Sequence, residues 1–416
     1  MAITKNRTTP GVYVTELSAF PASVVGVQTA VPIFIGYTET AKLGGRSIAL
    51  TPTLIASRAD YDLIFGGDGG TAYNLYDSIQ LFYANGGASC YIVSVGDYSG
   101  AVDAAALQKG LDAAGQQAGP TLLVIPDAVL ISPDSDPKQK IPHATAYGAL
   151  VRAMLAQCGA LQDRMALLDP YGAGAIDTSS AVATQAGIDA CIANFQADVG
   201  ESNLSYGAAY FPPLKVGAGV AGQYRLLPPS GAMAGIYSTN DANIGVWNAP
   251  ANVIVQGIAG LSLPLNSAQQ GPLNTPLDGK AVNAIRDFVG RGPVVWGART
   301  LDGNSNDWRY IQVRRTIIYI EQSIKTALQP FVFAANDGQT WATATAMISN
   351  FLQQLWSQGG LMGATASEAF TVQCGLGSTM TEQDILNGYM IVQVTLQVVR
   401  PAEFIALTFQ QQMQSA

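Results

Sequence analysis

The chain has 416 residues, enough for roughly two or three domains, and its 21 basic and 29 acidic residues give a net charge of −8. This balance gives nucleic-acid binding no support, because no basic stripe is present to neutralise phosphates. Only 12% of the residues are charged, which is about half the usual fraction. Since a soluble monomer of this size needs more surface charge, we favour a subunit buried against other subunits over a monomer covered by uncharged polar residues.

No segment predicts a membrane span, a signal peptide or a disulfide framework. The most apolar stretch near the start, residues 24–37, is broken by Pro32 and is shorter than the roughly 20 residues that a span needs. The first ten residues are polar and lack an apolar signal core. Four widely spaced cysteines are expected to be buried small hydrophobes, not a disulfide or metal framework: Cys90, Cys158, Cys191 and Cys374.

Residues 1–30 are predicted to form an extended N-terminal arm that joins an inner domain. The turn at Thr9-Pro10-Gly11 precedes an extended segment over 12–16, and 24–29 is extended again after Pro21. No helical periodicity occurs in this part of the chain.

From residue 31 to about 270, apolar strand runs alternate with helical segments, which predicts an α/β middle domain. We expect strands near 33–37, 90–95, 121–126 and 164–169, and helices near 73–83, 101–114, 144–157 and 177–195. Residues 212–276 are dense in Gly, Pro and Asn, so we expect loops and short strands leading out of this domain.

Residues 271–403 are predicted to form an α+β inner domain. Apolar positions three and four apart predict a helix from near Asp307 to Gln329, and a second helix after Asp337. Strict alternation over 390–398 then predicts a half-buried strand. A second alternation, carried by Ile405, Leu407 and Phe409, predicts a C-terminal arm strand within residues 404–416. Such a terminal strand is either paired in its own sheet or available to another chain.

Catalysis finds little support in the sequence. The single histidine, His143, lies in a polar loop beside Pro142, and such a residue is usually just solvated. The glycine-rich segment 66–71 lacks the lysine of a phosphate loop and follows a predicted helix, so we favour a surface loop. Asp134 and Asp136 have calcium-loop spacing without the downstream Gly and Glu, so we favour a plain turn. We expect no catalytic, cofactor-binding or metal-binding residues.

Positive charge follows the first long helix, at Arg309, Arg314, Arg315 and Lys325. We interpret it as the solvated face of an amphipathic helix. Contact with an acidic partner is the alternative.

Several segments, in this order, resemble the contractile tail sheath family of bacteriophages, R-type bacteriocins and phage-tail-like injection particles. They are TPGVYVTE at 9–16, NGGASCYIV at 85–93, PPSG at 228–231, GVWNAPAN at 245–252, VWGARTL at 295–301, WRYI at 308–311, VRR at 313–315 and RPAEFI at 400–405. Each is weak alone, but their order and combination are specific.

The resemblance implies a tail-sheath-like fold of mixed α+β and α/β class. Both chain ends build the inner, tube-facing α+β domain, the α/β middle domain is inserted and faces outward, and extended arms complete the subunit. It further implies a structural protein, not an enzyme, which stacks as hexameric rings around an inner tube. Contraction drives that tube through a target envelope.

The implied partners are other copies of the chain, the inner tube protein, and baseplate and tail terminator or cap proteins. Nucleic acid and membrane insertion are not implied. The implied location is a virion tail or phage-tail-like particle assembled in the bacterial cytoplasm without a signal peptide. A single chain with both opening and closing motifs favours a phage-like particle over the two-chain type VI secretion sheath. The alternatives are a static helical tube or shell protein and, in another class, a nucleotide-binding α/β enzyme.

Three groups of residues are candidates for assembly. The intersubunit arms are expected to use Val12, Tyr13, Val14, Val25, Val27, Phe404, Ile405, Leu407 and Phe409. The template strand to which an arm adds is expected to present Val392, Val394 and Leu396. The candidates for facing the tube are Arg314, Arg315 and Lys325.

Overall fold

The computed structural model describes residues 23–135, 140–217 and 223–404. Its centre is an eight-stranded sheet in the order β13-β12-β8-β7-β6-β1-β5-β4, in which the six inner strands run parallel. Antiparallel strands close both edges. The strands are β1 (Pro32–Gly36), β4 (Thr53–Ile55), β5 (Cys90–Ser94), β6 (Leu122–Val124), β7 (Met165–Leu168), β8 (Gly207–Phe211), β12 (Val282–Phe288) and β13 (Gly292–Val295).

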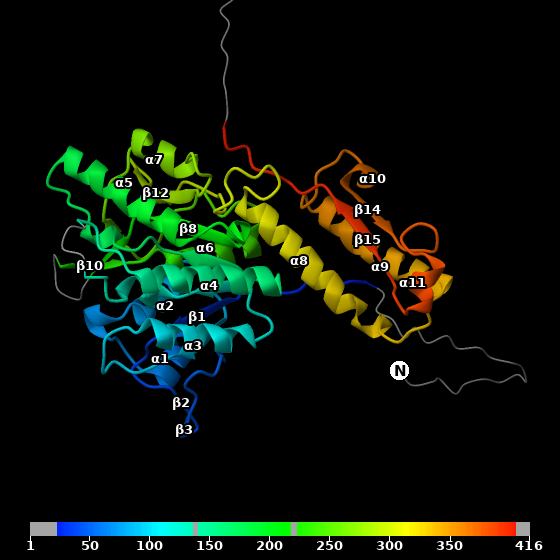
Figure 1. Ribbon diagram of the computed structural model, residues 1–416, viewed down its shortest axis with the longest axis horizontal. Helices are drawn as coiled ribbons and strands as arrows, with labels where there is room; N and C mark the ends of the chain where they lie inside the picture. The colour runs from blue at the N-terminus through cyan, green and yellow to red at the C-terminus, as the bar shows by residue number, and fades with distance from the viewer. Residues whose placement is uncertain (1–22, 136–139, 218–222, 405–416) are drawn as a thin grey trace, which may run out of the picture.

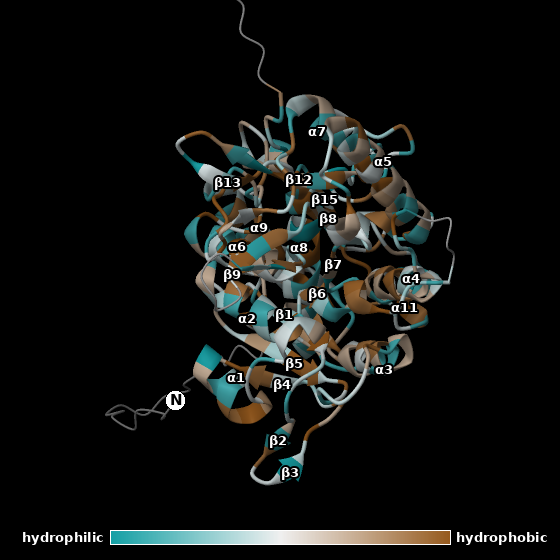
Figure 2. Ribbon diagram, turned by 90° about the vertical axis from the view of Figure 1, so that its left-hand side faces the viewer, coloured by the Kyte–Doolittle hydropathy of each residue, from teal (hydrophilic) through white to brown (hydrophobic). Residues whose placement is uncertain are grey.

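Helices cover both faces of this sheet, which explains why its central strands are continuous apolar runs. In β1, Ile33 and Ile35 join the core on one face and Phe34 joins the core on the other. Figure 2 shows α3 (Ala104–Gly115) and α4 (Thr145–Leu161) on one side of the central strands, and α2 (Leu75–Ala84) and α6 (Ser230–Asn243) on the other. We call the sheet and its covering helices the large body. Its other elements are α1 (Arg58–Phe65), α5 (Ala181–Asp198), α7 (Ser267–Asn274), the hairpin β2 (Lys42–Leu43) and β3 (Arg46–Ser47), and the small sheet β9 (Leu214–Gly217), β10 (Tyr224–Leu227) and β11 (Gly260–Leu261).

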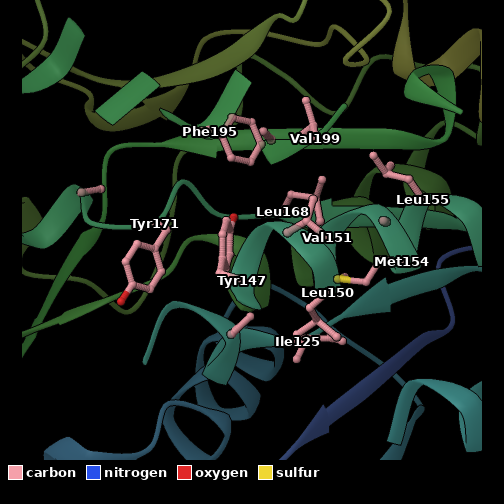
Figure 3. Packing of buried hydrophobic residues seen from close by; sticks show 14 of the residues in the cluster. Ile125, Tyr147, Leu150, Val151, Met154, Leu155, Leu168, Tyr171, Phe195 and Val199 are labelled. Atoms are coloured by element: carbon pink, nitrogen blue, oxygen red, sulfur yellow. The ribbon is translucent and has the colours of Figure 1, made fainter. Parts of the chain in front are cut away.

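Figure 3 shows the core under α4. Leu150, Val151 and Met154 project from the helix toward Ile125 and Leu168 at the ends of their strands. All five side chains are almost fully buried. Burying each such side chain is worth roughly 1.5–3 kcal/mol, so this helix is held mainly by its packed face.

The remaining elements form a smaller unit. The long helix α8 (Ile311–Leu328), drawn in yellow in Figure 1, runs from the large body into this unit. The small unit contains the C-terminal half of α8, α9 (Gly338–Ser357), α10 (Ala366–Ala369), β14 (Phe370–Gln373), α11 (Glu382–Leu386) and β15 (Gln393–Leu396). Its core is a cluster of its own, to which α8 contributes Ile320 and Ala327.

The structure corrects two predicted positions, the domain boundary at residue 270 and the start of the first long helix. The domain boundary does not lie between 270 and 271, because β12 and β13 are hydrogen-bonded into the large sheet and the first half of β12 is fully buried. The large body therefore continues to residue 295, and the Gly-rich stretch before it marks no domain boundary. The first long helix begins at Ile311 instead of near Asp307, because Tyr310 bridges Arg299 and Thr300 N–H donates to Arg309 O. Its end at Leu328 and the start of α9 after Asp337 are as predicted.

Two buried aspartates follow neighbouring parallel strands of the large sheet. Asp127 lies after β6, and its carboxylate accepts hydrogen bonds from Tyr37 N–H and Asn74 N–H. Asp169 lies after β7 and accepts one from Ser230 N–H at 2.9 Å. Burial raises the pKa of Asp127 to about 6 and that of Asp169 to about 7. Desolvation of the charged form therefore outweighs these hydrogen bonds.

The raised pKa of Asp169 predicts a pH-dependent stability. Between its ordinary pKa of 3.8 and about 7, the folded chain keeps a proton that the unfolded chain has lost. The free energy of unfolding therefore falls as pH rises from 4 to 7. Asp169→Asn should remove roughly 1–3 kcal/mol of this decline, measured by denaturant unfolding across the pH range. Asp287→Asn, at an exposed carboxylate, is the control. An unchanged pH profile in Asp169→Asn would contradict the assignment.

Candidate assembly site

Strands β14 and β15 form a two-stranded antiparallel sheet in the small unit. The expected template residues Val392, Val394 and Leu396 all pack against the core of this unit. The residues between them, Gln393 and Thr395, are exposed. The prediction of a half-buried strand is therefore confirmed, although the regular strand is shorter than residues 390–398.

The register leaves one edge of β15 open. Gln397 N–H donates to Ala369 O at 2.9 Å, so Gln397 directs its backbone groups toward the side on which β14 lies. Because successive residues of an antiparallel strand direct their backbone groups to opposite sides, those of Val394 and Leu396 face away from β14. In the described part of the chain no strand pairs with that side. This edge is a ready template for an added strand.

The N-terminal segment that leads into β1 lies against its own subunit. Val24 is buried in the core of the small unit, and Val27 N–H donates to Ser323 Oγ on α8 at 3.1 Å. Val25, between them, is 78% exposed. The segment from 24 to 27 is therefore fastened along α8. The expected arm residues Val12, Tyr13 and Val14 lie outside the described residues.

The C-terminal arm is described only at its beginning. Phe404 has a side chain that is 75% exposed. The other expected members, Ile405, Leu407 and Phe409, lie outside the described residues.

Two of the three candidates for facing the tube are not surface residues. Arg315 is 4% exposed, and its guanidinium makes two hydrogen bonds to the Asp241 carboxylate, at 2.8 and 2.5 Å. Arg314 is 6% exposed, lies 3.5 Å over the Trp308 ring and donates to Ser205 Oγ at 2.7 Å. The interpretation of a solvated basic face is therefore wrong for both residues, and only Lys325 is exposed.

The burial has a simple cause. The first half of α8 is covered on all sides because it packs against the large body, so its polar positions are enclosed together with its apolar ones. Burial alone lowers the pKa of an arginine, but the Asp241 carboxylate outweighs it and raises the pKa of Arg315. The two groups thus form an ion pair inside the protein.

The residues considered for chemistry have structural roles. His143 Nε2 lies 2.9 Å from Asp198 Oδ1, which ties its loop to the end of α5. Asp134 caps α4 by accepting from Thr145 N–H at 2.9 Å. The glycine-rich segment follows α1. Among the described residues, no group of three or more His, Cys, Asp or Glu is placed to hold a metal ion. No helix in the described ranges is long and apolar enough to cross a membrane.

Comparison with known proteins identifies the family. The family model described as the phage tail sheath C-terminal domain matches residues 304–412. A putative prophage major tail sheath protein of Pseudomonas aeruginosa is 25% identical over 75% of this chain and 74% of its own. Two solved structures match 98% of the chain. The sheath of an extracellular contractile injection system, PVC, in the contracted state has 32% identity, a TM-score of 0.72 and 99% of its own chain covered. The helical sheath of the anti-feeding prophage in the contracted state has 35% identity, a TM-score of 0.72 and all of its chain covered.

The chain belongs to the contractile tail sheath family.

Membership confirms the resemblance and the mixed α+β and α/β fold class. The tail sheath family model begins just before α8 and continues beyond the last described residue. It therefore includes the open edge of β15 and residues 404–412 of the expected C-terminal arm. The family is a structural one, which is consistent with a protein that is not an enzyme.

Sequence reasoning missed two features of this tail sheath subunit. The partner of Arg315 lies 74 residues away in the sequence. Glu403, near the end of the described chain, pairs with Arg299 at 2.7 Å. Neither pair has a local signal, although Arg299, Arg315 and Glu403 all lie in segments that carry the family resemblance.

If the Arg315–Asp241 pair is buried, removing its carboxylate should destabilise the subunit much more than removing a surface charge. Asp241→Asn leaves the Arg315 guanidinium buried without its counter-charge, which should lower the free energy of unfolding by roughly 3–5 kcal/mol. Lys325→Gln, at an exposed position of the same helix, should change it by less than about 0.5 kcal/mol. Denaturant unfolding of the isolated subunit measures both. A loss below about 1 kcal/mol in Asp241→Asn would show that the pair contributes little.

Proposed function

We propose that this tail sheath subunit polymerises into stacked hexameric rings around an inner tube and that the resulting sheath contracts to drive the tube through a target envelope. The observation that carries the proposal is the open edge of β15. There the backbone N–H and C=O groups of Val394 and Leu396 have no partner strand among the described residues, while the side chains of the same residues pack against the core of the small unit. The likeness to two sheaths captured in the contracted state supports contraction over a static tube or shell.

The arms supply the strand that this edge lacks. A terminal segment of a neighbouring copy, with Leu407 at its centre, adds to β15 by backbone hydrogen bonds and places alternate side chains against the small unit. Each added bond is worth roughly 1 kcal/mol net. A buried leucine adds roughly 1.5–3 kcal/mol before ordering costs. A few such contacts link subunits while leaving their globular parts free to shift.

The small unit faces the tube in this proposal, and the large body faces outward. Lys325 is the remaining candidate for contact with the tube, since it is exposed on the part of α8 that belongs to the small unit. An isolated surface contact of this kind is worth roughly 0–1 kcal/mol. Weak contacts suit a sheath that must release the tube as it shortens. Baseplate and terminator or cap proteins complete the particle, which assembles in the bacterial cytoplasm.

Proline in the C-terminal arm tests strand addition. Leu407→Pro removes a backbone donor and breaks the added strand, so the subunit should fold normally but form no long sheaths. Electron microscopy of particles and thermal unfolding of the subunit measure the two effects. Gln414→Pro, beyond the alternating residues, is the matched control and should assemble. Ordered sheaths from Leu407→Pro would remove this arm from the lattice.

Contraction is tested separately, on wild-type particles imaged before and after a pulse of denaturant. A contractile sheath should become shorter and wider along the tube. A sheath that dissociates without ever shortening would favour the static alternative.

A further inference from the structure

The chain returns from the small unit to the large body before its C-terminal arm begins. Residues 397–404, which we call the strap, run from the end of β15 toward the start of α8 (Figure 1), where Glu403 contacts Tyr310. At its start the strap is held in the small unit, where Gln397 O accepts from Met362 N–H at 2.7 Å and Val398 bridges Leu361.

At its other end the strap is held mainly by the Glu403 carboxylate. An exposed ion pair also joins Arg400 of the strap to Asp307, at 3.8 Å. Glu403 accepts hydrogen bonds from Arg299 Nη2 at 2.7 Å, Arg299 Nε at 2.9 Å, Asn274 Nδ2 at 2.7 Å and the Tyr310 hydroxyl at 3.0 Å. These donors come from the end of α7, the loop after β13 and the residue before α8. A carboxylate offers about four acceptor sites, so the group is fully used. Burial raises the pKa of Glu403, but the bonds to Arg299 and Asn274 outweigh it and lower the pKa below its usual 4.5.

The main partner of Glu403 is itself fixed to the large sheet. Arg299 has a side chain that is only 5% exposed. Its backbone N–H donates to Asn283 Oδ1 at 2.7 Å, and its carbonyl accepts from Asn283 Nδ2 at 2.8 Å. Asn283 belongs to β12 and is buried. A continuous path of hydrogen bonds therefore leads from Glu403 into the eight-stranded sheet.

We propose that Glu403 is the anchor that fastens the C-terminal arm to the large body, so that tension on the arm passes into the eight-stranded sheet and not into the two-stranded sheet of the small unit. This proposal rests on the linking role of the arm given above. If Glu403 is the anchor, Phe404 is the first residue at which the arm can change direction relative to the large body. A bidentate arginine–carboxylate pair suits this task because it fixes direction as well as position.

The anchor is tested by cleavage of the isolated full-length subunit with chymotrypsin. Cleavage after Phe404 requires the residues around it to fit an extended protease cleft, so Glu403 must first leave Arg299. In Glu403→Gln the initial rate of cleavage after Phe404 should rise roughly tenfold or more, since cleavage follows the population of the open form. Cleavage after Phe409, followed by mass spectrometry in the same sample, is the internal reference and should not change.

Further variants distinguish loss of the anchor from unfolding of the subunit. Asn274→Ala and Tyr310→Phe each remove one donor without leaving Arg299 unpaired, so the subunit stays folded and cleavage after Phe404 should rise by a few-fold. Glu382→Gln, at an exposed carboxylate in the small unit, should match the wild type. Equal rates after Phe404 in the wild type, Glu403→Gln and both donor variants overturn the anchor.

Assembly then separates the anchor from the function on which it rests. Sheaths of Asn274→Ala or Glu403→Gln should form but break into short pieces on contraction, because the arm no longer passes its load to the large body. Intact contracted sheaths from variants that are cleaved faster would overturn the load-bearing role. Failure of the linking role itself would appear as normal assembly of Leu407→Pro, a result that leaves the cleavage measurement unaffected.

Discussion

The burial of α8 between two packed units is the constraint on which the rest of the subunit depends. Among the described residues, this helix alone contributes to all three hydrophobic clusters: Ile318 and Ile311 enter the two cores of the large body and Ile320 the core of the small unit. The Arg315–Asp241 pair lies in the same half of the helix as the first two. Detaching the first half of α8 from the large body would expose both apolar surface and the buried Arg315–Asp241 pair, and the second cost alone is several kcal/mol. The two units are therefore held in one orientation.

That fixed orientation is what an ordered polymer needs from its subunit. The segment ending at Val31, the helix α8 and the strap all cross between the two units, and each is fastened on both sides. The open edge of β15 is thus presented at a set angle to the large body. In the proposed sheath, movement between subunits is confined to the arms, because the units inside one subunit have no loose connection.

An open strand edge is a hazard in a soluble protein, since any other strand can pair with it. Here the edge strand has only four residues, and its exposed face carries Gln393 and Thr395 instead of charges or proline. The short length of the edge limits accidental pairing, and the lack of charges or proline leaves the backbone groups available to an arm. The low charged fraction of the whole chain, 12%, fits the proposed polymer, in which other copies of the chain cover much of the subunit's surface.

The sequence by itself determined the features that depend on near neighbours. Pro330, the helical spacing after Asp337 and the alternation through Val394 predicted where α8 ends, where α9 begins and where β15 lies. Proline and periodicity act over a few residues. Ordered motifs determined the family. Only the tertiary structure decided that Arg314 and Arg315 are buried, and that β12 belongs to the large sheet. It also decided that Glu403 meets Arg299 across 104 positions of sequence. The physical reason is that burial and ion pairing depend on which distant segments come together in space, and a helical pattern looks the same whether one face or the whole circumference is covered.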